Sequence, residues 1–317
     1  MRAAQLSKPR ANAWSPSLGG LDKSLGTVLH CLEPLSAHTS LRLGGEADYF
    51  VNASSLQQIS QSISFARQRT LNWMVLGNGT NILFPDEGYR GLVIHLGRNW
   101  GGWQLEAGGR LRCHSGASLG GLLGWLGQRG QHGLDFLVGI PGSVGGAVAM
   151  NAGIPQATIG ARVESVRALD PQGRLLKLDH DGCRFGYRSS LFRRPGWVVL
   201  EVTLRLGEPG ERRQGDWDAA RLLARRRARQ PLRGHSAGCV FKNPTPPQPS
   251  AGALLERAGL KAMRIGGASI SALHANFILN RGEASSREVR QLIDIARDKV
   301  YKEFEVELQL ELAVVSN

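Results

Sequence analysis

The sequence predicts a mixed α/β protein that is divided into several domains. Its 317 residues are 42% hydrophobic, which is enough apolar material for two or three separate cores. Helix-like and strand-like patterns alternate along the chain without a repeat of fixed period, so a solenoid is not expected. Two glycine-rich segments, at 76–88 and 139–153, interrupt these patterns and are the first candidates for a binding site.

The first unit covers residues 28–96. The run ADYFV predicts a strand, SLQQISQSISFARQR a helix, and WMVLG and GLVIHL two further strands with a glycine-rich loop between them. Residues 1–27 are polar and rich in Ser, Gly and Pro, without a sustained period. We therefore expect a flexible extension ahead of the first unit.

The second unit, residues 97–213, contains mostly strand patterns. LRCHSGA and GWVVLEVTLRL predict single strands, and RVESVRALDPQGRLLKL predicts a hairpin that turns between Asp170 and Gly173. The segment SLGGLLGWLGQRG predicts one helix among them.

The third unit, residues 214–303, is predicted to contain three helices. They are a basic helix in DAARLLARRRAR, a short one in SAGALLERAG that stops at a glycine, and a long one after a capping-box pattern at Ser285 and Glu288. Apolar residues keep one face of the long helix: Val289, Leu292, Ile293, Ala296 and Val300. The tail VELQLEL then alternates strictly, which predicts a half-buried strand with Glu311 on its polar face.

The net charge of +13 favours an anionic partner, which leaves nucleic acid, an acidic surface or a phosphorylated small molecule open. The basic residues are scattered except in ARRRAR, and only 6% of residues are aromatic, so few side chains are available for base stacking. Nucleic-acid binding is therefore the less favoured alternative. The triple arginine at 225–227 is expected to be a solvated helix face rather than a diphosphate clamp.

The cysteines indicate free thiols in a reducing compartment. Cys31, Cys113, Cys183 and Cys239 form no CxxC pair and have no metal-ligand spacing, so we expect no metal site. The first residues lack the apolar core of a signal peptide, and the longest apolar run is interrupted by Pro141 and several glycines. We expect a cytoplasmic protein that does not bind or cross a membrane.

The loop LGNGTNILFPDEG at 76–88 has the composition of an anion site. Gly77 and Gly79 permit positive φ and inward N–H groups, and three side chains add donors: Asn78, Thr80 and Asn81. A Rossmann fingerprint is excluded, because Pro85 stands where the helix of that motif would run. A tight turn between two strands explains this loop equally well.

The loop GIPGSVGGAVAMNAG at 139–153 carries five glycines among small neighbours: Gly139, Gly142, Gly145, Gly146 and Gly153. So many glycines are unfavourable for folding unless the backbone must approach a flat or anionic ligand. Together, the two loops suit a large cofactor with a diphosphate and a ring system.

Two further segments contain reactive groups with common structural explanations. In CRFGYRSSLF, Arg188 is able to clamp a carboxylate, but most such arginines form surface ion pairs. In AGCVFKNP, Cys239 precedes a Lys-Asn-Pro turn, but an isolated cysteine is more often a small buried hydrophobe.

Six motifs in order make the chain resemble the UDP-N-acetylenolpyruvoylglucosamine reductase (MurB) family over residues 38–314. They are HTSLRLGGEADYFV, LGNGTNILFPDEGYRGLVI, GLDFLVGIPGSVGGAVAMNAG, FGYRSSLF, SAGCVFKNP and AGALLERAGLKAMRIGGASISALHANFILN. The resemblance implies an FAD-binding fold like that of vanillyl-alcohol oxidase and PCMH proteins. In it, 28–96 and 97–213 are the two FAD-binding subdomains, a strand at 304–317 joins the first, and 214–303 is the substrate-binding domain.

The resemblance also implies the reaction. NADPH reduces FAD, and the enolpyruvyl ether of UDP-N-acetylglucosamine then accepts hydride at C3 and a proton at C2, giving UDP-N-acetylmuramate for peptidoglycan synthesis. The short connection after FGYRSSLF resembles the type II subgroup of the family, and we expect a monomer. Another FAD-linked oxidoreductase of the same superfamily is the alternative, and a basic nucleic-acid-binding protein is a more distant one.

By the same resemblance, Cys239 matches the family's proton donor, which is usually a serine. Arg188 matches the arginine that binds the substrate carboxylate, and Glu311 the glutamate that assists the charged intermediate, although VELQLEL departs from the commonest family form. The implied FAD-binding set is Gly77, Asn78, Gly79, Thr80, Asn81, Gly139, Pro141, Gly142, Ser143, Gly145, Gly146 and Ala147. The implied substrate contacts are Tyr187, Lys242, Asn243 and His274, although a lone histidine before an apolar run is more often structural.

Overall fold

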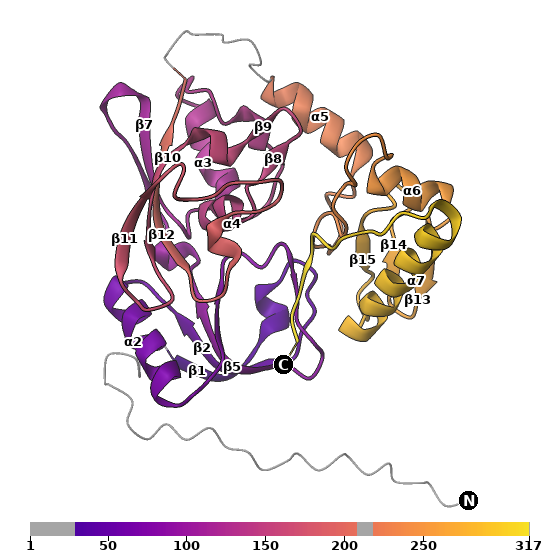
Figure 1. Cartoon of the computed structure of the whole chain (residues 1–317), viewed down its shortest axis with the longest axis horizontal. Helices are drawn as coiled ribbons and strands as arrows, with labels where there is room; N and C mark the ends of the chain where they lie inside the picture. The colour runs from indigo at the N-terminus through magenta and orange to yellow at the C-terminus, as the bar shows by residue number, and fades with distance from the viewer. Residues whose placement is uncertain (1–28, 208–217, 317) are drawn as a thin grey trace, which may run out of the picture.

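The computed structural model describes residues 29–207 and 218–316 (Figure 1). The expected extension at 1–27 and the expected boundary between residues 213 and 214 lie outside this range. The described residues form two neighbouring α/β regions and a third group of helices and small strands beside them. Short 3₁₀ turns connect many of the elements: η1 (Leu35–His38), η2 (Arg98–Trp100), η3 (Ala107–Gly109), η4 (Asp135–Leu137), η5 (Ile159–Arg162) and η6 (Leu191–Arg193).

The first region is a four-stranded sheet in the order β1-β2-β5-β3, covered by one helix. Its elements are β1 (Leu29–Pro34), β2 (Glu46–Asn52), α2 (Leu56–Gln68), β3 (Trp73–Leu76) and β5 (Tyr89–His95). The predicted strand, helix, strand, loop and strand are confirmed, and α2 begins at the N-cap Ser55. The sequence analysis missed β1, because LHCLEP has no β-branched residue and ends in a proline.

The second region is an antiparallel sheet in the order β11-β10-β12-β7-β6. Its strands are β6 (Trp103–Leu105), β7 (Arg110–His114), β10 (Val163–Leu169), β11 (Leu175–Asp179) and β12 (Val198–Arg205). The predicted hairpin is confirmed, and the Gly173 N–H donates to the Asp170 carbonyl at 2.8 Å. Two helices and a small ribbon complete the region: α3 (Leu119–Gly127), α4 (Val144–Ala149), β8 (Gly153–Ile154) and β9 (Ala157–Thr158).

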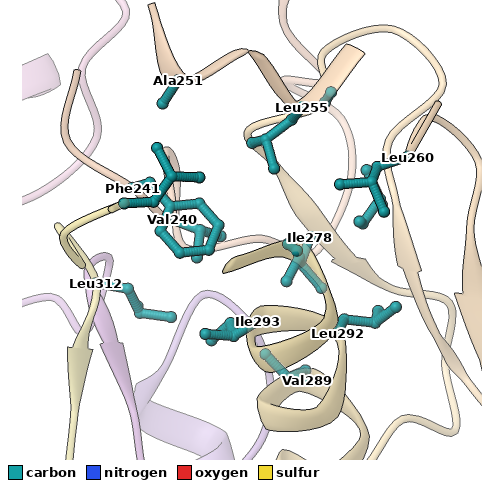
Figure 2. Close-up of a cluster of buried hydrophobic side chains, with 14 of the residues drawn as sticks. Val240, Phe241, Ala251, Leu255, Leu260, Ile278, Val289, Leu292, Ile293 and Leu312 are labelled. Carbon is teal, nitrogen blue, oxygen red and sulfur yellow. The ribbon is translucent and has the colours of Figure 1, made fainter. Parts of the chain in front are cut away.

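The third region packs two helices, α6 (Ala251–Arg257) and α7 (Ser286–Phe304), with a small antiparallel sheet, and its core is drawn in Figure 2. The strands are β13 (Arg264–Ile265), β14 (Ala268–Ile270) and β15 (Ile278–Asn280), and the preceding helix α5 (Ala219–Arg229) lies against η4 of the second region. The capping box at Ser285 and Glu288 is confirmed, and all five apolar residues predicted for α7 are buried.

The C-terminal tail keeps the predicted alternation, with Val306, Leu308 and Leu312 buried and Glu307 and Gln309 exposed, but its backbone differs from the predicted strand. Residues 305–309 are not in a regular strand, and within 306–312 only Leu310 forms an isolated bridge, to Phe241. The Val240 carbonyl accepts N–H bonds from both Glu311 (2.8 Å) and Leu312 (3.2 Å), which breaks the even alternation of a strand. The tail then returns to the first region, where β16 (Ala313–Val314) pairs in parallel with β4 (Ile82–Leu83) (Figure 1).

Within residues 29–207 and 218–316, no helix is long and apolar enough to cross a membrane. No group of three or more His, Cys, Asp or Glu side chains there is arranged to hold a metal ion.

Candidate active site

The two glycine-rich loops face each other where the first and second regions meet. The Thr80 hydroxyl donates to the Pro141 carbonyl at 3.4 Å, although the two residues are 61 positions apart. A Cβ atom on Gly77 would lie 2.6 Å from the Oγ of Ser143, and one on Gly142 would lie 3.1 Å from the Oγ1 of Thr80. The loops therefore approach each other as closely as their backbones permit.

A pocket of about 480 Å³ lies beside this meeting point. Its lining combines both loops with β3, the connection from η6 to β12, and the C-terminal tail: Gly77, Ser143, Gly145, Gly146, Trp73, Val75, Arg193, Trp197 and Val315 among others. The Ser115 hydroxyl also lines it and is buried without a hydrogen-bond partner among the described residues. A buried unpaired hydroxyl is unfavourable, so this wall fits a polar ligand.

The glycines of these loops are required for different structural reasons. Gly79 has φ +59°, as expected, but Gly77 does not have a positive φ and must be glycine because Ser143 lies against it. A Cβ on Gly145 would lie 2.6 Å from the Cβ of Ser115, so this glycine serves the packing of α4. At Gly146 a Cβ would meet only the Oγ of Ser143, at 3.4 Å, which leaves space on the pocket side.

The other residues expected to bind the cofactor lie in different environments. The Asn81 Nδ2 donates to the Glu311 carbonyl at 3.1 Å, so its amide holds the C-terminal tail as well as bordering the loop. Gly139 has φ +76°, Ala147 is buried in α4, and Asn78 is exposed.

Arg188 lies in a tight turn that leads into η6. Gly186 and Ser189 exchange two backbone hydrogen bonds, of 3.0 and 3.2 Å, and Arg188 is held at φ +50°. This left-handed conformation is unfavourable for a residue with a Cβ, so neighbouring groups must maintain it. The buried Asn151 amide donates to the Gly186 carbonyl at 2.9 Å, and the Arg188 Nη2 donates to the Gly153 carbonyl at 3.1 Å. The guanidinium is thereby fixed in direction.

Glu311 faces this guanidinium. Its Oε1 lies 2.9 Å from the Nε of Arg188, and the two side chains are only 18% and 19% exposed. Burial raises the pKa of the Glu311 carboxyl, although nearby Arg188 and Lys242 oppose the shift. With its Nε beside Glu311 and one Nη2 bond to Gly153, the guanidinium still has further N–H donors for a second carboxylate.

Cys239 approaches the same place from the third region, where it forms an isolated bridge with Phe277. Burial raises the pKa of its thiol from 9.0 to about 12, and the Glu311 carboxylate adds to this shift, whereas Arg188 and Arg226 oppose it. The thiol is therefore protonated at neutral pH. The Glu311 N–H donates to the carbonyl of Val240, the residue after Cys239, and the Glu311 side chain meets Arg188, so the three residues lie in one site although they are far apart in the sequence.

Arg226 is a residue of this site that the sequence analysis missed. Arg225 and Arg227 are exposed, as expected for a solvated face, but Arg226 is half-buried. A Cβ on Gly139 would lie 2.9 Å from the Cδ of Arg226, and burial lowers the pKa of its guanidinium. Leu222 precedes Arg226 by four residues and is also half-buried, so the helical period marks Arg226 as inward-facing.

The four expected substrate contacts divide into two groups. The Tyr187 hydroxyl accepts the backbone N–H of Asn243 at 3.2 Å and so joins the second and third regions, while Lys242 lies close enough to Glu311 to lower its pKa. The Asn243 Oδ1 accepts the Ala251 N–H at the start of α6 (3.1 Å).

His274 has a structural environment. Its Nδ1 accepts the Asn276 N–H at 3.2 Å, its ring packs against Phe277, and a Cβ on Gly252 would lie 2.9 Å from its Cε1. None of these described contacts is with Cys239, Arg188 or Glu311.

The fold and the glycine-lined pocket define the class of protein as an FAD-binding oxidoreductase. Residues 47–179 match the family described as FAD binding domain. The fold is shared with cholesterol oxidase from Brevibacterium sterolicum, with a TM-score of 0.50 and 15% identity over 62% of this chain and 40% of that chain. The expected FAD-binding fold is therefore confirmed.

The third region and the whole-chain comparisons identify the family. Residues 230–315 match the family described as UDP-N-acetylenolpyruvoylglucosamine reductase, C-terminal domain. A UDP-N-acetylenolpyruvoylglucosamine reductase of Moorella thermoacetica is 44% identical over 296 residues, which is 93% of this chain and 96% of that protein. A crystal structure of the reductase from Thermus caldophilus has a TM-score of 0.73 and 32% identity, covering 91% of this chain and 98% of that one. The chain belongs to the UDP-N-acetylenolpyruvoylglucosamine reductase family.

Proposed function

We propose that the chain reduces the enolpyruvyl ether of UDP-N-acetylglucosamine to UDP-N-acetylmuramate, a step in peptidoglycan precursor synthesis, with FAD as prosthetic group and NADPH as reductant. Membership of the family over most of the chain supports this reaction. The observation that carries it is the convergence of Cys239, Arg188 and Glu311, from three separate parts of the sequence, at a point where Asn81 of the first glycine-rich loop bonds to the Glu311 carbonyl.

The glycine-lined pocket suits FAD. Gly77, Gly145 and Gly146 line it without side chains, and the buried Ser115 hydroxyl has no partner among the described residues. Bound there, FAD supplies the hydride for C3 of the enolpyruvyl group after NADPH has reduced it. We assign its contacts to the two glycine-rich loops, 77–81 and 139–147, and expect Asn81 to contribute mainly by holding the tail.

The protein's own groups then complete the reduction. Cys239 donates its thiol proton to C2 of the substrate. The sulfur becomes negative in this step, and the two guanidiniums of Arg188 and Arg226 are the nearby groups that favour the thiolate. Arg226 therefore assists Cys239 in releasing its proton to the substrate.

Arg188 has a second role at the substrate carboxylate. Its guanidinium, fixed by the bond to the Gly153 carbonyl, is suited to hold that carboxylate and to stabilise the enolate that develops beside it. Glu311 balances the charge of Arg188 when no substrate is bound. Because burial raises its pKa, the Glu311 carboxyl can also take up a proton and donate a hydrogen bond to the charged intermediate. We assign the sugar and diphosphate of the substrate to Tyr187, Lys242 and Asn243. His274 is assigned a supporting position next to Phe277.

The finer organisation is also part of this proposal. We assign 28–96 with the tail at 304–317, and 97–213, to FAD binding, and 214–303 to substrate binding. The connection between η6, which ends at Arg193, and β12, which begins at Val198, is short and supports the type II subgroup. We also assign a monomeric unit, and we assign the NADPH-dependent reaction to the cytoplasm.

Gly146→Leu is expected to weaken FAD binding by about tenfold or more while leaving the apoprotein at least as stable. A side chain at Gly146 meets no protein backbone and extends toward the pocket, and removing a helical glycine gains about 0.5–1 kcal/mol. FAD titration by fluorescence and thermal unfolding of the apoprotein measure the two effects.

Two glycines serve as controls for that variant. Gly124→Ala in α3 projects into open space and should keep full FAD affinity, whereas Gly145→Ala meets the Ser115 Cβ and should lower stability itself. Unchanged FAD affinity in Gly146→Leu would show that the cofactor lies elsewhere.

The rate of substrate reduction is expected to stay constant on the alkaline side from pH 7 to 10. With its pKa raised to about 12, the Cys239 thiol keeps its proton throughout this range, whereas an ordinary thiol would lose it near pH 9.0. Single-turnover oxidation of the reduced enzyme by the enolpyruvyl substrate measures this rate. A decline with an apparent pKa near 9 that disappears in Cys239→Ser would contradict the assignment.

The function itself is tested by NADPH oxidation under anaerobic conditions. The purified protein should carry bound flavin and oxidise NADPH continuously only when the UDP-linked enolpyruvyl ether is present. Flavin reduction by NADPH with no response to that ether would instead indicate another oxidoreductase with the same fold.

A further inference from the structure

The N-terminus of α7 is bound by a carboxylate that belongs to a different region of the protein. The Ser286 N–H donates to the Oδ1 of Asp86 at 2.7 Å, and the Arg287 N–H donates to its Oδ2 at 3.0 Å. The Ser286 hydroxyl also donates to the Phe84 carbonyl. Since the first N–H groups of a helix have no partner within the helix, Asp86 satisfies two of them across the boundary between regions.

Asp86 belongs to the first glycine-rich loop, residues 76–88. Asn81, five residues earlier, holds the Glu311 carbonyl, so the same stretch of chain contacts both α7 and the catalytic tail. A second link lies nearby, where the Ser40 hydroxyl bonds to the carbonyls of Gly79 (3.3 Å) and Ser236 (2.7 Å). The third region, which carries Cys239, is thus attached to the glycine-rich loop on two sides.

We propose that Asp86 is a positioning residue that fixes the substrate-binding region against the FAD-binding loop and thereby holds Cys239 beside Arg188 and Glu311. This inference rests on the proposed function for its catalytic consequence. The claim that Asp86 attaches α7 to the first region depends only on its two hydrogen bonds to the α7 backbone. A carboxylate is suited to this place because it offers two acceptor oxygens and a negative charge to the positive end of a long helix.

The neighbouring residue provides a matched control. Glu87 has the same charge and faces the same helix turn, but its pairing with Arg287 is long, at 3.8 Å, and both side chains are mostly exposed, at 66% and 77%. Exposed ion pairs contribute little. Glu87→Gln therefore tests whether loss of any negative charge near the start of α7 has the same effect as loss of the Asp86 carboxylate.

The experiment compares Asp86→Ala, Asp86→Asn and Glu87→Gln with the unmodified holoenzyme. The first readout is the rate at which iodoacetamide alkylates Cys239 at pH 9, followed by peptide mass spectrometry. The second is hydrogen exchange of the α7 amides, and the third is the single-turnover rate with the enolpyruvyl substrate. Asp86→Asn covers the case in which Asp86→Ala fails to fold.

We expect Asp86→Ala to expose Cys239 and raise its alkylation at least fivefold, to speed exchange at Ser286 and Arg287, and to slow substrate reduction at least tenfold. FAD content should be retained. Asp86→Asn, which keeps one acceptor oxygen, should lie between, and Glu87→Gln should match the unmodified protein.

Unchanged alkylation and exchange in both Asp86 variants would overturn the proposal, as would equal effects from Glu87→Gln. The alkylation and exchange readouts do not depend on the reaction. If the unmodified enzyme failed to reduce the enolpyruvyl ether, the proposed function would fail while these readouts would still decide whether Asp86 positions the region.

Discussion

Cys239→Ala is expected to keep rapid flavin reduction by NADPH and to slow flavin reoxidation by the enolpyruvyl substrate by about 10²–10⁴-fold, the usual contribution of a positioned general acid. Hydride transfer leaves negative charge at C2 and the carboxylate, and the thiol is the proton source that the structure places beside Arg188 and Glu311. Anaerobic stopped-flow absorbance of the flavin separates the two half-reactions, so loss in only the second identifies the donor.

Two substitutions control this experiment. Cys31→Ala removes the other partly accessible thiol and should leave both half-reactions unchanged. Cys239→Ser restores a hydroxyl donor at the same position and should recover much of the second half-reaction. A Cys239→Ala enzyme that is reoxidised at the original rate would exclude the thiol as proton donor.

Arg188→Ala is expected to lower kcat by about 10²–10³-fold and to raise the KM for the enolpyruvyl substrate, because it removes a fixed donor from the developing enolate and from the carboxylate. It also leaves Glu311 half-buried without its ion-pair partner. Steady-state kinetics with the enolpyruvyl ether measure the effect, and thermal unfolding reports any change in stability separately.

The matched variants separate charge from geometry. Arg188→Lys keeps the charge but loses the planar fork, so it should recover binding better than turnover. Arg184→Ala removes an exposed arginine four residues earlier in the same segment and should have little effect. Equal losses in Arg184→Ala and Arg188→Ala would mean that the segment, rather than one guanidinium, is responsible.

Local patterns in the sequence were sufficient for most α-helices and for seven of the nine strands in the two larger sheets that the structure describes, but not for the short strands elsewhere. The capping box at Ser285 and the apolar face of α7 predicted that helix because both depend on residues three or four positions apart. The hairpin of β10 and β11 was equally local, since its turn residues set its register. These elements need no information from the rest of the fold.

The site was less accessible from the sequence, because its residues meet only through tertiary structure. Strict alternation placed Glu311 on a solvated strand face, but the two bonds to the Val240 carbonyl break that strand and the side chain meets Arg188. Gly77 was assigned a positive φ, whereas its true constraint is the proximity of Ser143 from the other loop. In both cases, a distant segment decides the local conformation.

The arginines at 225–227 show a second reason why part of the site was not predicted from the sequence. Composition predicted a solvated basic face, and two of the three side chains follow that prediction. Arg226 faces inward because the half-buried Leu222 lies on the same side of α5, a signal that the sequence contains but that charge counting overlooks. Periodicity within a charged run therefore carries information about a site.

The most direct test is a crystal structure of the FAD-loaded enzyme with the enolpyruvyl substrate bound. The account predicts that the Sγ of Cys239 lies about 3–4 Å from C2 of the substrate, on the face opposite the flavin, with the Arg188 guanidinium on the substrate carboxylate. A substrate bound with C2 well beyond the reach of the sulfur, or with its carboxylate away from Arg188, would contradict the central claim.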